Sequence, residues 1–174
     1  MIKIILNSLK KGLLTEPIGT KELRVENFEN IGRELKSLIN VRFGRSLAIR
    51  EVDTGSCGAC ESEISALNNP IYDIQRFGID FVASPRHADA LLVTGALSRN
   101  MAIALKKTFD AAPNPKFVIA LGQCMCDESV FKNSYYSLSS KVEDILGVPV
   151  VRIKGCPPSP IQIASSLLAF LKKP

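Results

Sequence analysis

Two short apolar segments constrain the fold more than any other feature of this sequence. Residues 90–94 read Ala-Leu-Leu-Val-Thr and residues 117–121 read Phe-Val-Ile-Ala-Leu. A strand with one solvent-exposed face alternates apolar and polar residues, whereas consecutive apolar residues indicate a strand that is buried on both faces. Such strands are typical of parallel sheets covered by helices on both sides. We therefore expect both segments to lie inside an α/β domain.

Further strand and helix patterns alternate along the chain after Gly44. Apolar runs predict additional strands at 47–52, 79–83 and 148–153, and apolar residues at three- and four-residue steps predict helices at 100–111, 139–146 and 160–172. Ser159 and Pro160 suit the start of the last helix, as cap and as first helical residue. This alternation predicts a flavodoxin-like, doubly wound, mostly parallel sheet.

Residues 1–43 are predicted to form an N-terminal extension to this domain, which spans residues 44–174. Between Glu22 and Asn40 the apolar residues Phe28, Ile31, Leu35 and others recur at helical spacing. The extension should therefore contain an amphipathic helix. It could pack on the domain or on a partner, and the sequence leaves both possibilities open.

Cysteines follow three of the predicted strands. Cys57 and Cys60 form a C-x-x-C turn after the first strand, Cys124 follows the strand at 117–121, and Cys156 follows the strand at 148–153. The carboxyl ends of parallel strands meet at one edge of a sheet, where ligand sites form. We therefore expect four thiols to converge there.

Four converging thiols allow more than one chemistry. A 4Fe-4S cluster needs four thiolates, and the glycines near these cysteines let the backbone approach closely. The wide gaps between Cys60, Cys124 and Cys156 differ from a ferredoxin run and from a zinc ribbon. Structural zinc and a redox dithiol remain alternatives. A disulfide framework is not expected, because the cysteines number five and the chain is predicted to be cytoplasmic.

Charge and hydropathy argue against two other classes. The net charge is +5, but the 22 Lys and Arg residues are dispersed and few aromatic residues lie among them. Nucleic-acid binding is therefore not expected. The sequence has no secretory or twin-arginine signal and no apolar run near the ~18 residues that span a bilayer. We expect no direct membrane span, and any attachment should come through other subunits.

Four segments resemble the small subunit of energy-converting, membrane-bound NiFe hydrogenases and the homologous 4Fe-4S subunit of respiratory complex I. The resemblance spans about residues 44–172, and the segments that carry it are 53–64 (DTGSCGACESEI), 72–79 (YDIQRFGI), 84–95 (SPRHADALLVTG) and 155–160 (GCPPSP). The complex I branch is expected to have adjacent cysteines in the first motif. Because Cys57 and Cys60 are separated, the hydrogenase-like branch fits better.

The resemblance implies an electron-transfer subunit that is not catalytic alone. One 4Fe-4S cluster on Cys57, Cys60, Cys124 and Cys156 would relay electrons between a ferredoxin-like iron-sulfur subunit and a large NiFe-type catalytic subunit. Membrane subunits would hold this complex at the cytoplasmic face of the membrane. Related complexes without nickel-iron, which reduce sulfur compounds or quinone, are an alternative, as is a zinc-stabilised interaction module.

The resemblance also implies residues around the cluster. Arg86 or His87 would lie close enough to hydrogen-bond sulfur, and Glu63 would serve the interface or a proton path. Without the resemblance, Arg86 and His87 read as a polar turn and Glu63 as a solvated carboxylate near a helix start. The glycines expected at the site are Gly55, Gly122 and Gly155.

The third cysteine turn departs from the resemblance. Relatives usually have a Gly-Gly pair after this cysteine, whereas this chain reads Cys124-Met125-Cys126. Cys126 is an alternative ligand, although Cys124 keeps the expected spacing from Gly122. The turn at 94–100 lacks a G-x-G-x-x-G or Walker pattern, and we expect it to form a wall of the cluster pocket instead of a nucleotide site.

Overall fold

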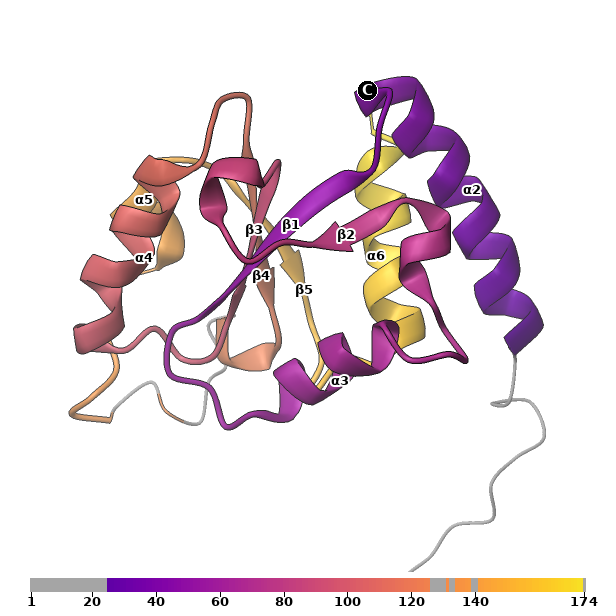
Figure 1. The fold of residues 1–174 in the computed structure, drawn as a ribbon. Helices are drawn as coiled ribbons and strands as arrows, with labels where there is room; N and C mark the ends of the chain where they lie inside the picture. Colours follow the sequence, from indigo (N-terminus) through magenta and orange to yellow (C-terminus); the bar gives the residue numbers. More distant parts are fainter. Residues whose placement is uncertain (1–24, 126–130, 132–133, 139–140, 174) are drawn as a thin grey trace, which may run out of the picture.

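The fold is built around a five-stranded parallel sheet with the strand order β2-β1-β3-β4-β5 (Figure 1). The computed structural model describes residues 25–125, 131, 134–138 and 141–173. Each of the five predicted strands is present, and the bounds are β1 Leu47–Asp53, β2 Ile79–Phe81, β3 Ala90–Thr94, β4 Phe117–Leu121 and β5 Val150–Ile153. This strand order is that of flavodoxin-like sheets, so the predicted fold class is confirmed.

Helices cover both faces of the sheet, as Figure 1 shows, with α4 and α5 on one face and α2 and α6 on the other. The helices are α2 (Val25–Phe43), α3 (Ala59–Leu67), α4 (Arg99–Ala111), α5 (Val142–Leu146) and α6 (Pro160–Leu171). Three short 3-10 helices are η1 (Ile74–Phe77), η2 (Pro85–His87) and η3 (Gln123–Met125). The structure thus confirms the predicted helices, except that residues 139–140 of the predicted helix 139–146 lie outside the described part of the chain and α5 begins at Val142. It adds α3, which the sequence patterns did not predict.

Two hydrophobic cores lie on opposite sides of the sheet, and β3 contributes to both. Its residues Ala90 and Leu92 belong to the core beneath α2, α3 and α6, whereas Leu91 and Val93 belong to the core beneath α4 and α5. Each of these side chains is at most 2% exposed. The consecutive apolar pattern of β3 therefore has the predicted cause, which is burial on both faces.

Helix α2, which falls in the predicted N-terminal extension, packs against the rest of the fold. Its residues Phe28, Leu35 and Ile39 are buried in the same core as α6. An ion pair links α2 to the C-cap residue of α6, with 2.6 Å between Lys172 Nζ and Glu34 Oε2. The amphipathic helix is confirmed from Val25 onward, and the predicted residues 22–24 lie outside the described part of the chain.

Truncation of Leu35 to alanine should show how much α2 contributes to stability. Leu35 is fully buried, and removing such a side chain costs about 2–5 kcal/mol of the free energy of unfolding. The matched control is Val41→Ala in the same helix, because Val41 is 81% exposed. Urea unfolding measures both. Equal unfolding midpoints for the two variants would show that α2 does not stabilise the domain.

Candidate metal centre

Turns at the carboxyl ends of β1, β4 and β5 bring four cysteines to one edge of the sheet, which is the lower edge in Figure 1. Backbone hydrogen bonds join the last two turns. Gly122 N donates to Ile153 O over 2.8 Å, and Gln123 N donates to Gly155 O over 2.7 Å. The turn that carries Cys124 is therefore fixed to the turn that carries Cys156.

The C-x-x-C turn after β1 is shaped by local hydrogen bonds. The Asp53 carboxylate accepts from the backbone N–H groups of Gly55 and Ser56, both over 2.8 Å. Such bonds stabilise a turn directly after a strand. Helix α3 then begins at Ala59, so Cys57 lies in the turn and Cys60 lies in the first helical turn.

The turn after β3 packs against the C-x-x-C turn. Ser98 N donates to Thr54 O over 2.8 Å, and the buried Thr54 hydroxyl donates to Thr94 O over 2.7 Å. A Cβ on Gly95 would lie only 2.5 Å from Ser56 N. This contact agrees with the expectation that residues 94–100 form a wall beside the cysteines.

Gly122 is the point where the first and third cysteine turns meet. A Cβ at this position would lie 2.7 Å from Cys60 Sγ, closer than real Cβ contacts allow. Gly122 also has φ +96°, which L side chains rarely adopt. Both the backbone conformation and the adjacent thiol therefore require glycine.

The other three cysteines affect the pKa of the Cys60 thiol. Its pKa is raised from 9.0 to about 11, first by burial and then by the charges of Glu61, Cys124, Cys57 and Cys156, in that order of importance. The other three thiols are thus close enough to Cys60 to disfavour its thiolate form. A positively charged iron or zinc centre would relieve this repulsion, and the donor set fits such a group.

We expect Cys60 to react slowly with iodoacetamide in the metal-free chain. A rise in pKa from 9.0 to about 11 lowers the thiolate fraction near pH 8 about 100-fold. Higher intrinsic nucleophilicity of the more basic thiolate offsets part of this, which leaves a rate about tenfold below that of an ordinary thiol. Mass spectrometry of labelled peptides over pH 7–11 measures the rate. A Cys60 rate that levels off near pH 9 would contradict the raised pKa.

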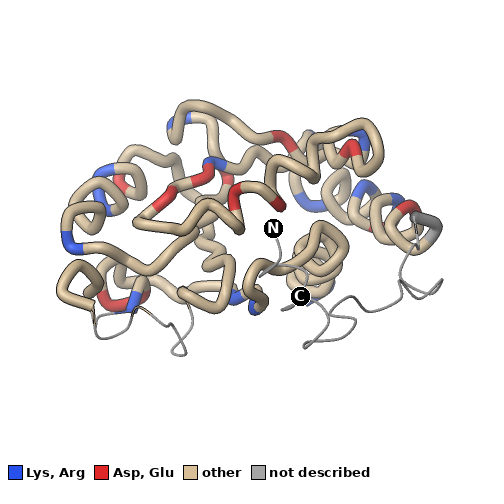
Figure 2. The backbone as a smooth tube through the Cα atoms, turned by 90° about the horizontal axis from the view of Figure 1, so that it is seen from below, with Lys and Arg blue, Asp and Glu red and all other residues tan. Residues whose placement is uncertain are grey.

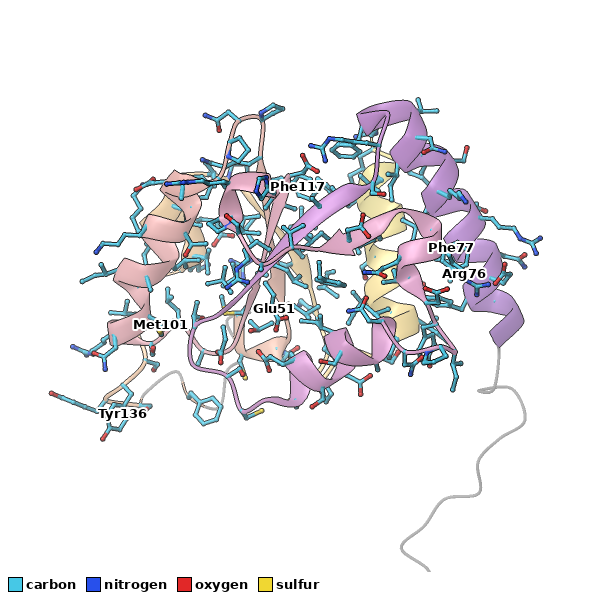
Figure 3. All side chains as sticks on the ribbon, viewed as in Figure 1. Glu51, Arg76, Phe77, Met101, Phe117 and Tyr136 are labelled. Carbon is cyan, nitrogen blue, oxygen red and sulfur yellow. The ribbon has the colours of Figure 1, made fainter. Side chains whose placement is uncertain are left out.

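Two acidic residues that the sequence did not single out lie near the cysteines. Burial raises the pKa of Glu51, and the Glu61 charge raises it further. Both carboxylate oxygens of Glu61 are buried without a hydrogen-bond partner among the described residues. Glu51 is labelled in Figure 3 near the lower part of the sheet, and Figure 2 shows acidic segments in the middle of the view from below. The Glu61 charge adds to the unfavourable negative charge at the Cys60 thiol. Glu61 directly follows Cys60, which is the only signal the sequence offered.

The other predicted residues fall into two groups. Gly55, Gly155 and Glu63 lie in the cysteine turns or in α3. Arg86 and His87 lie in η2, before the start of β3, and Asp89 N donates to Ala48 O at the start of β1 over 2.8 Å. The strands are parallel, so this position is at the edge opposite the cysteines. The structure therefore does not place Arg86 or His87 beside the thiols.

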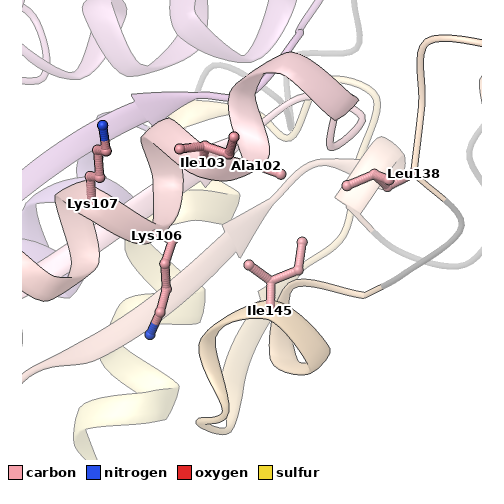
Figure 4. Close-up of a pocket in the computed structure, with 6 residues that line it drawn as sticks. All are labelled: Ala102, Ile103, Lys106, Lys107, Leu138 and Ile145. Carbon is pink, nitrogen blue, oxygen red and sulfur yellow. The ribbon is translucent and has the colours of Figure 1, made fainter.

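Two further features do not belong to the described cysteine site. Cys126, the alternative ligand, lies outside the described residues. A separate hollow of about 480 Å³ between α4 and α5 is lined by apolar side chains and two lysines, and none of its lining residues is a cysteine (Figure 4). We therefore treat this hollow as distinct from the cysteine edge.

The fold and the site define a flavodoxin-like α/β domain that presents thiols at the carboxyl edge of its sheet. This chain belongs to the family described as NADH ubiquinone oxidoreductase, 20 Kd subunit, whose model matches residues 57–170. The resemblance to hydrogenase small subunits and to the complex I subunit is thereby confirmed.

Individual relatives agree with this family. The chain is 41% identical over 130 residues to the probable membrane-bound hydrogenase subunit mbhJ of Pyrococcus furiosus, covering 75% of this chain and 77% of that protein. It is 39% identical over 136 residues to formate hydrogenlyase subunit 7 of Escherichia coli, and the match covers 78% of this chain and 51% of that protein. Relatives are thus subunits of multisubunit oxidoreductases, and this chain is a subunit of that kind.

A solved structure shows the same architecture. A chain in the membrane-bound sulfane sulfur reductase (MBS), an archaeal respiratory membrane complex, matches with a TM-score of 0.62 and 29% identity. The match covers 78% of this chain and 73% of that chain. This similarity extends the agreement from sequence to the arrangement of helices and strands.

Proposed function

We propose that this chain binds one 4Fe-4S cluster through Cys57, Cys60, Cys124 and Cys156 and relays electrons within a membrane-bound, energy-converting hydrogenase-like complex. The cluster would exchange electrons with another iron-sulfur subunit on one side and with a large catalytic subunit on the other. The observation that carries this proposal is the convergence of three cysteine turns at one edge of the sheet.

The spacing of the cysteines along the chain supports a cluster over a zinc ribbon. Zinc bound by four thiolates holds every sulfur about 2.3 Å from one point. In a zinc ribbon a second C-x-x-C pair usually completes the site, whereas Cys124 and Cys156 are 32 positions apart here. A 4Fe-4S cluster takes one thiolate per iron and thus needs its thiols around a larger space.

The chain's own residues would hold and insulate the cluster. Gly122 leaves room beside Cys60, and the hydrogen bonds of Thr54 and Ser98 fix the turns that surround the thiols. When bound, the cluster supplies one-electron transfer. No residue of this chain is assigned to bond making on a substrate.

Anaerobic purification with iron, sulfide and zinc analysis tests the proposal. We expect a brown protein with four iron atoms and four sulfides per chain, as a 4Fe-4S cluster requires, and an EPR signal after reduction. A colourless protein with one zinc atom per chain would instead establish the zinc-stabilised interaction module.

An exposed aromatic surface supports a partner subunit next to the cysteines. Tyr135 and Tyr136 are 79% and 73% exposed, Phe131 is 40% exposed, and the Arg99 guanidinium lies 5.5 Å from the Tyr135 ring centre. Arg99 N donates to Tyr136 O over 2.9 Å. The preceding residue, Ser98, donates its N–H to Thr54 O before the C-x-x-C turn, so this surface lies beside that turn. Tyrosine and arginine are enriched at protein interfaces. We assign this surface to the large catalytic subunit.

Attachment to the membrane is assigned to other subunits of the complex. Within the described part of the chain, no helix is both long enough and apolar enough to cross a bilayer. Relatives are named as parts of membrane-bound complexes. We propose that this chain lies peripherally, at the cytoplasmic face.

The similarity to the sulfane sulfur reductase favours a second candidate within the same class. The same relay would then serve a large subunit that lacks nickel-iron and reduces sulfur compounds or quinone. The cysteine motifs of the neighbouring large subunit distinguish the two. Two C-x-x-C pairs there indicate nickel-iron, and their absence indicates the second candidate.

A further inference from the structure

Arg152 connects three elements beside the third cysteine turn. It lies on β5, and its Nη1 atom donates to the Met125 carbonyl over 2.6 Å. Its Nη2 atom donates to both carboxylate oxygens of Glu143 on α5 over 2.7 and 2.8 Å. The side chains of Arg152 and Glu143 are 27% and 29% exposed. The guanidinium is thus held by Glu143 of α5. It also bonds to the last residue of η3, Met125.

The Met125 carbonyl belongs to the residue directly after Cys124. Upstream of Cys124, Gln123 N is bonded to Gly155 O over 2.7 Å. Downstream, the Met125 side chain is buried in the core, where its sulfur lies 4.0 Å from the Thr54 hydroxyl. The contact with Arg152 completes this restraint, so Cys124 is held between two fixed residues.

The strand that carries Arg152 leads directly to the last cysteine. β5 ends at Ile153 and leads through Gly155 to Cys156. The hydrogen bond from Arg152 to the Met125 carbonyl therefore ties the Cys124 turn to the strand that leads to Cys156. A loss of this contact would leave the relative position of the two thiols less restrained.

We infer that Arg152 is a positioning residue that sets the Cys124 thiol relative to the Cys156 thiol. The inference deepens the proposed function and rests on it where it concerns the cluster. Lysine cannot replace arginine fully, because one ammonium group lacks the planar fork that contacts Glu143 and the Met125 carbonyl together. An Arg152→Lys variant should therefore restrain the Cys124 turn less than arginine does and more than Arg152→Met does.

The parent for the test is the full chain with Cys126→Ser. This change removes the second thiol that follows Cys124 by two positions. Arg152→Met, Arg152→Lys and the control Arg45→Met are made in this parent. Arg45 is a matched control because it also pairs with a carboxylate, with 2.6 Å between Arg45 Nη2 and Asp89 Oδ1. Asp89 lies before β3, at the edge of the sheet opposite the cysteines.

Two readouts are needed, one with and one without the cluster. In the reconstituted chains, we expect Arg152→Met to lose iron to a chelator about tenfold faster than the parent and to change the EPR line shape. In the metal-free chains, a short bifunctional thiol reagent should link Cys124 to Cys156 more slowly in Arg152→Met. Arg152→Lys should lie between these values, and Arg45→Met should lower the unfolding midpoint without changing either readout.

The outcomes separate the two proposals. A parent that takes up no iron contradicts the cluster assignment, while the cross-linking rates still test Arg152. Unchanged cross-linking in Arg152→Met would refute the positioning role. Equal changes in Arg152→Met and Arg45→Met would also refute it, because general destabilisation would then account for both. If Arg152→Met does not fold, Arg152→Lys provides the same comparison.

Discussion

Replacing Cys156 with serine should abolish the iron-sulfur cluster and leave the fold of the metal-free chain intact. The side chain of Cys156 is exposed, so its replacement should change the free energy of unfolding by no more than about 0.5 kcal/mol. Serine is a poor ligand for iron compared with a thiolate, and the proposed site has no spare thiol on the same turn. Iron analysis, visible absorption and circular dichroism measure the two effects separately.

The matched control for this prediction is Cys126→Ser. Cys126 follows Cys124 by two positions and is not assigned to the cluster. We expect Cys126→Ser to retain iron at the level of the unchanged chain. If Cys156→Ser keeps its full iron content, or if Cys126→Ser loses it, the assigned set of four ligands is wrong.

Replacing Gly122 with alanine should cost both stability and cluster binding. The φ angle of +96° disfavours alanine by about 1–2 kcal/mol. The added Cβ would also lie 2.7 Å from Cys60 Sγ, and relief of such a contact typically costs about 1–3 kcal/mol. We expect a total loss of about 2–5 kcal/mol in the free energy of unfolding. Because the same methyl group displaces Cys60, iron binding should also fall.

Gly147→Ala separates the backbone effect from the contact with the thiol. Gly147 has φ +69°, and a Cβ there would meet no atom within 4 Å. Its replacement should therefore cost only the conformational part, about 1–2 kcal/mol, and leave iron binding unchanged. Chemical denaturation and iron analysis of both variants provide the comparison. Equal losses of stability would show that the contact between Gly122 and Cys60 is unimportant.

Most of the sheet could be predicted because burial on both faces leaves a clear pattern. Ala90–Thr94 and Phe117–Leu121 coincide with β3 and β4 at both ends. Helix α3 was not predicted, because Ile64 and Leu67 are the only large apolar side chains among its nine residues. Its periodic signal is correspondingly weak. Patterns thus revealed the elements that are rich in large apolar residues, the short helix α5 included, and missed the one with few.

The surroundings of the cysteines were harder to predict than the cysteines. Arg86 and His87 were expected nearby because of the family resemblance, yet the chain returns to the opposite edge of the sheet before β3 begins. Glu61 and Arg152 were not singled out. Glu61 matters through its burial beside Glu51, and Arg152 through contacts with two other elements. These relationships join residues that are distant in the chain or depend on burial.

The sequence by itself determined the strand pattern, the parallel α/β class and the placement of each described cysteine after a strand. These properties follow from hydrophobic periodicity and from the rule that parallel strands end at one edge. The tertiary structure alone decided that α2 packs on the domain, that Gly122 lies against Cys60 and that Arg152 holds the Met125 carbonyl. Each of these depends on distances between segments far apart in the chain, and periodicity along a sequence carries no such distances.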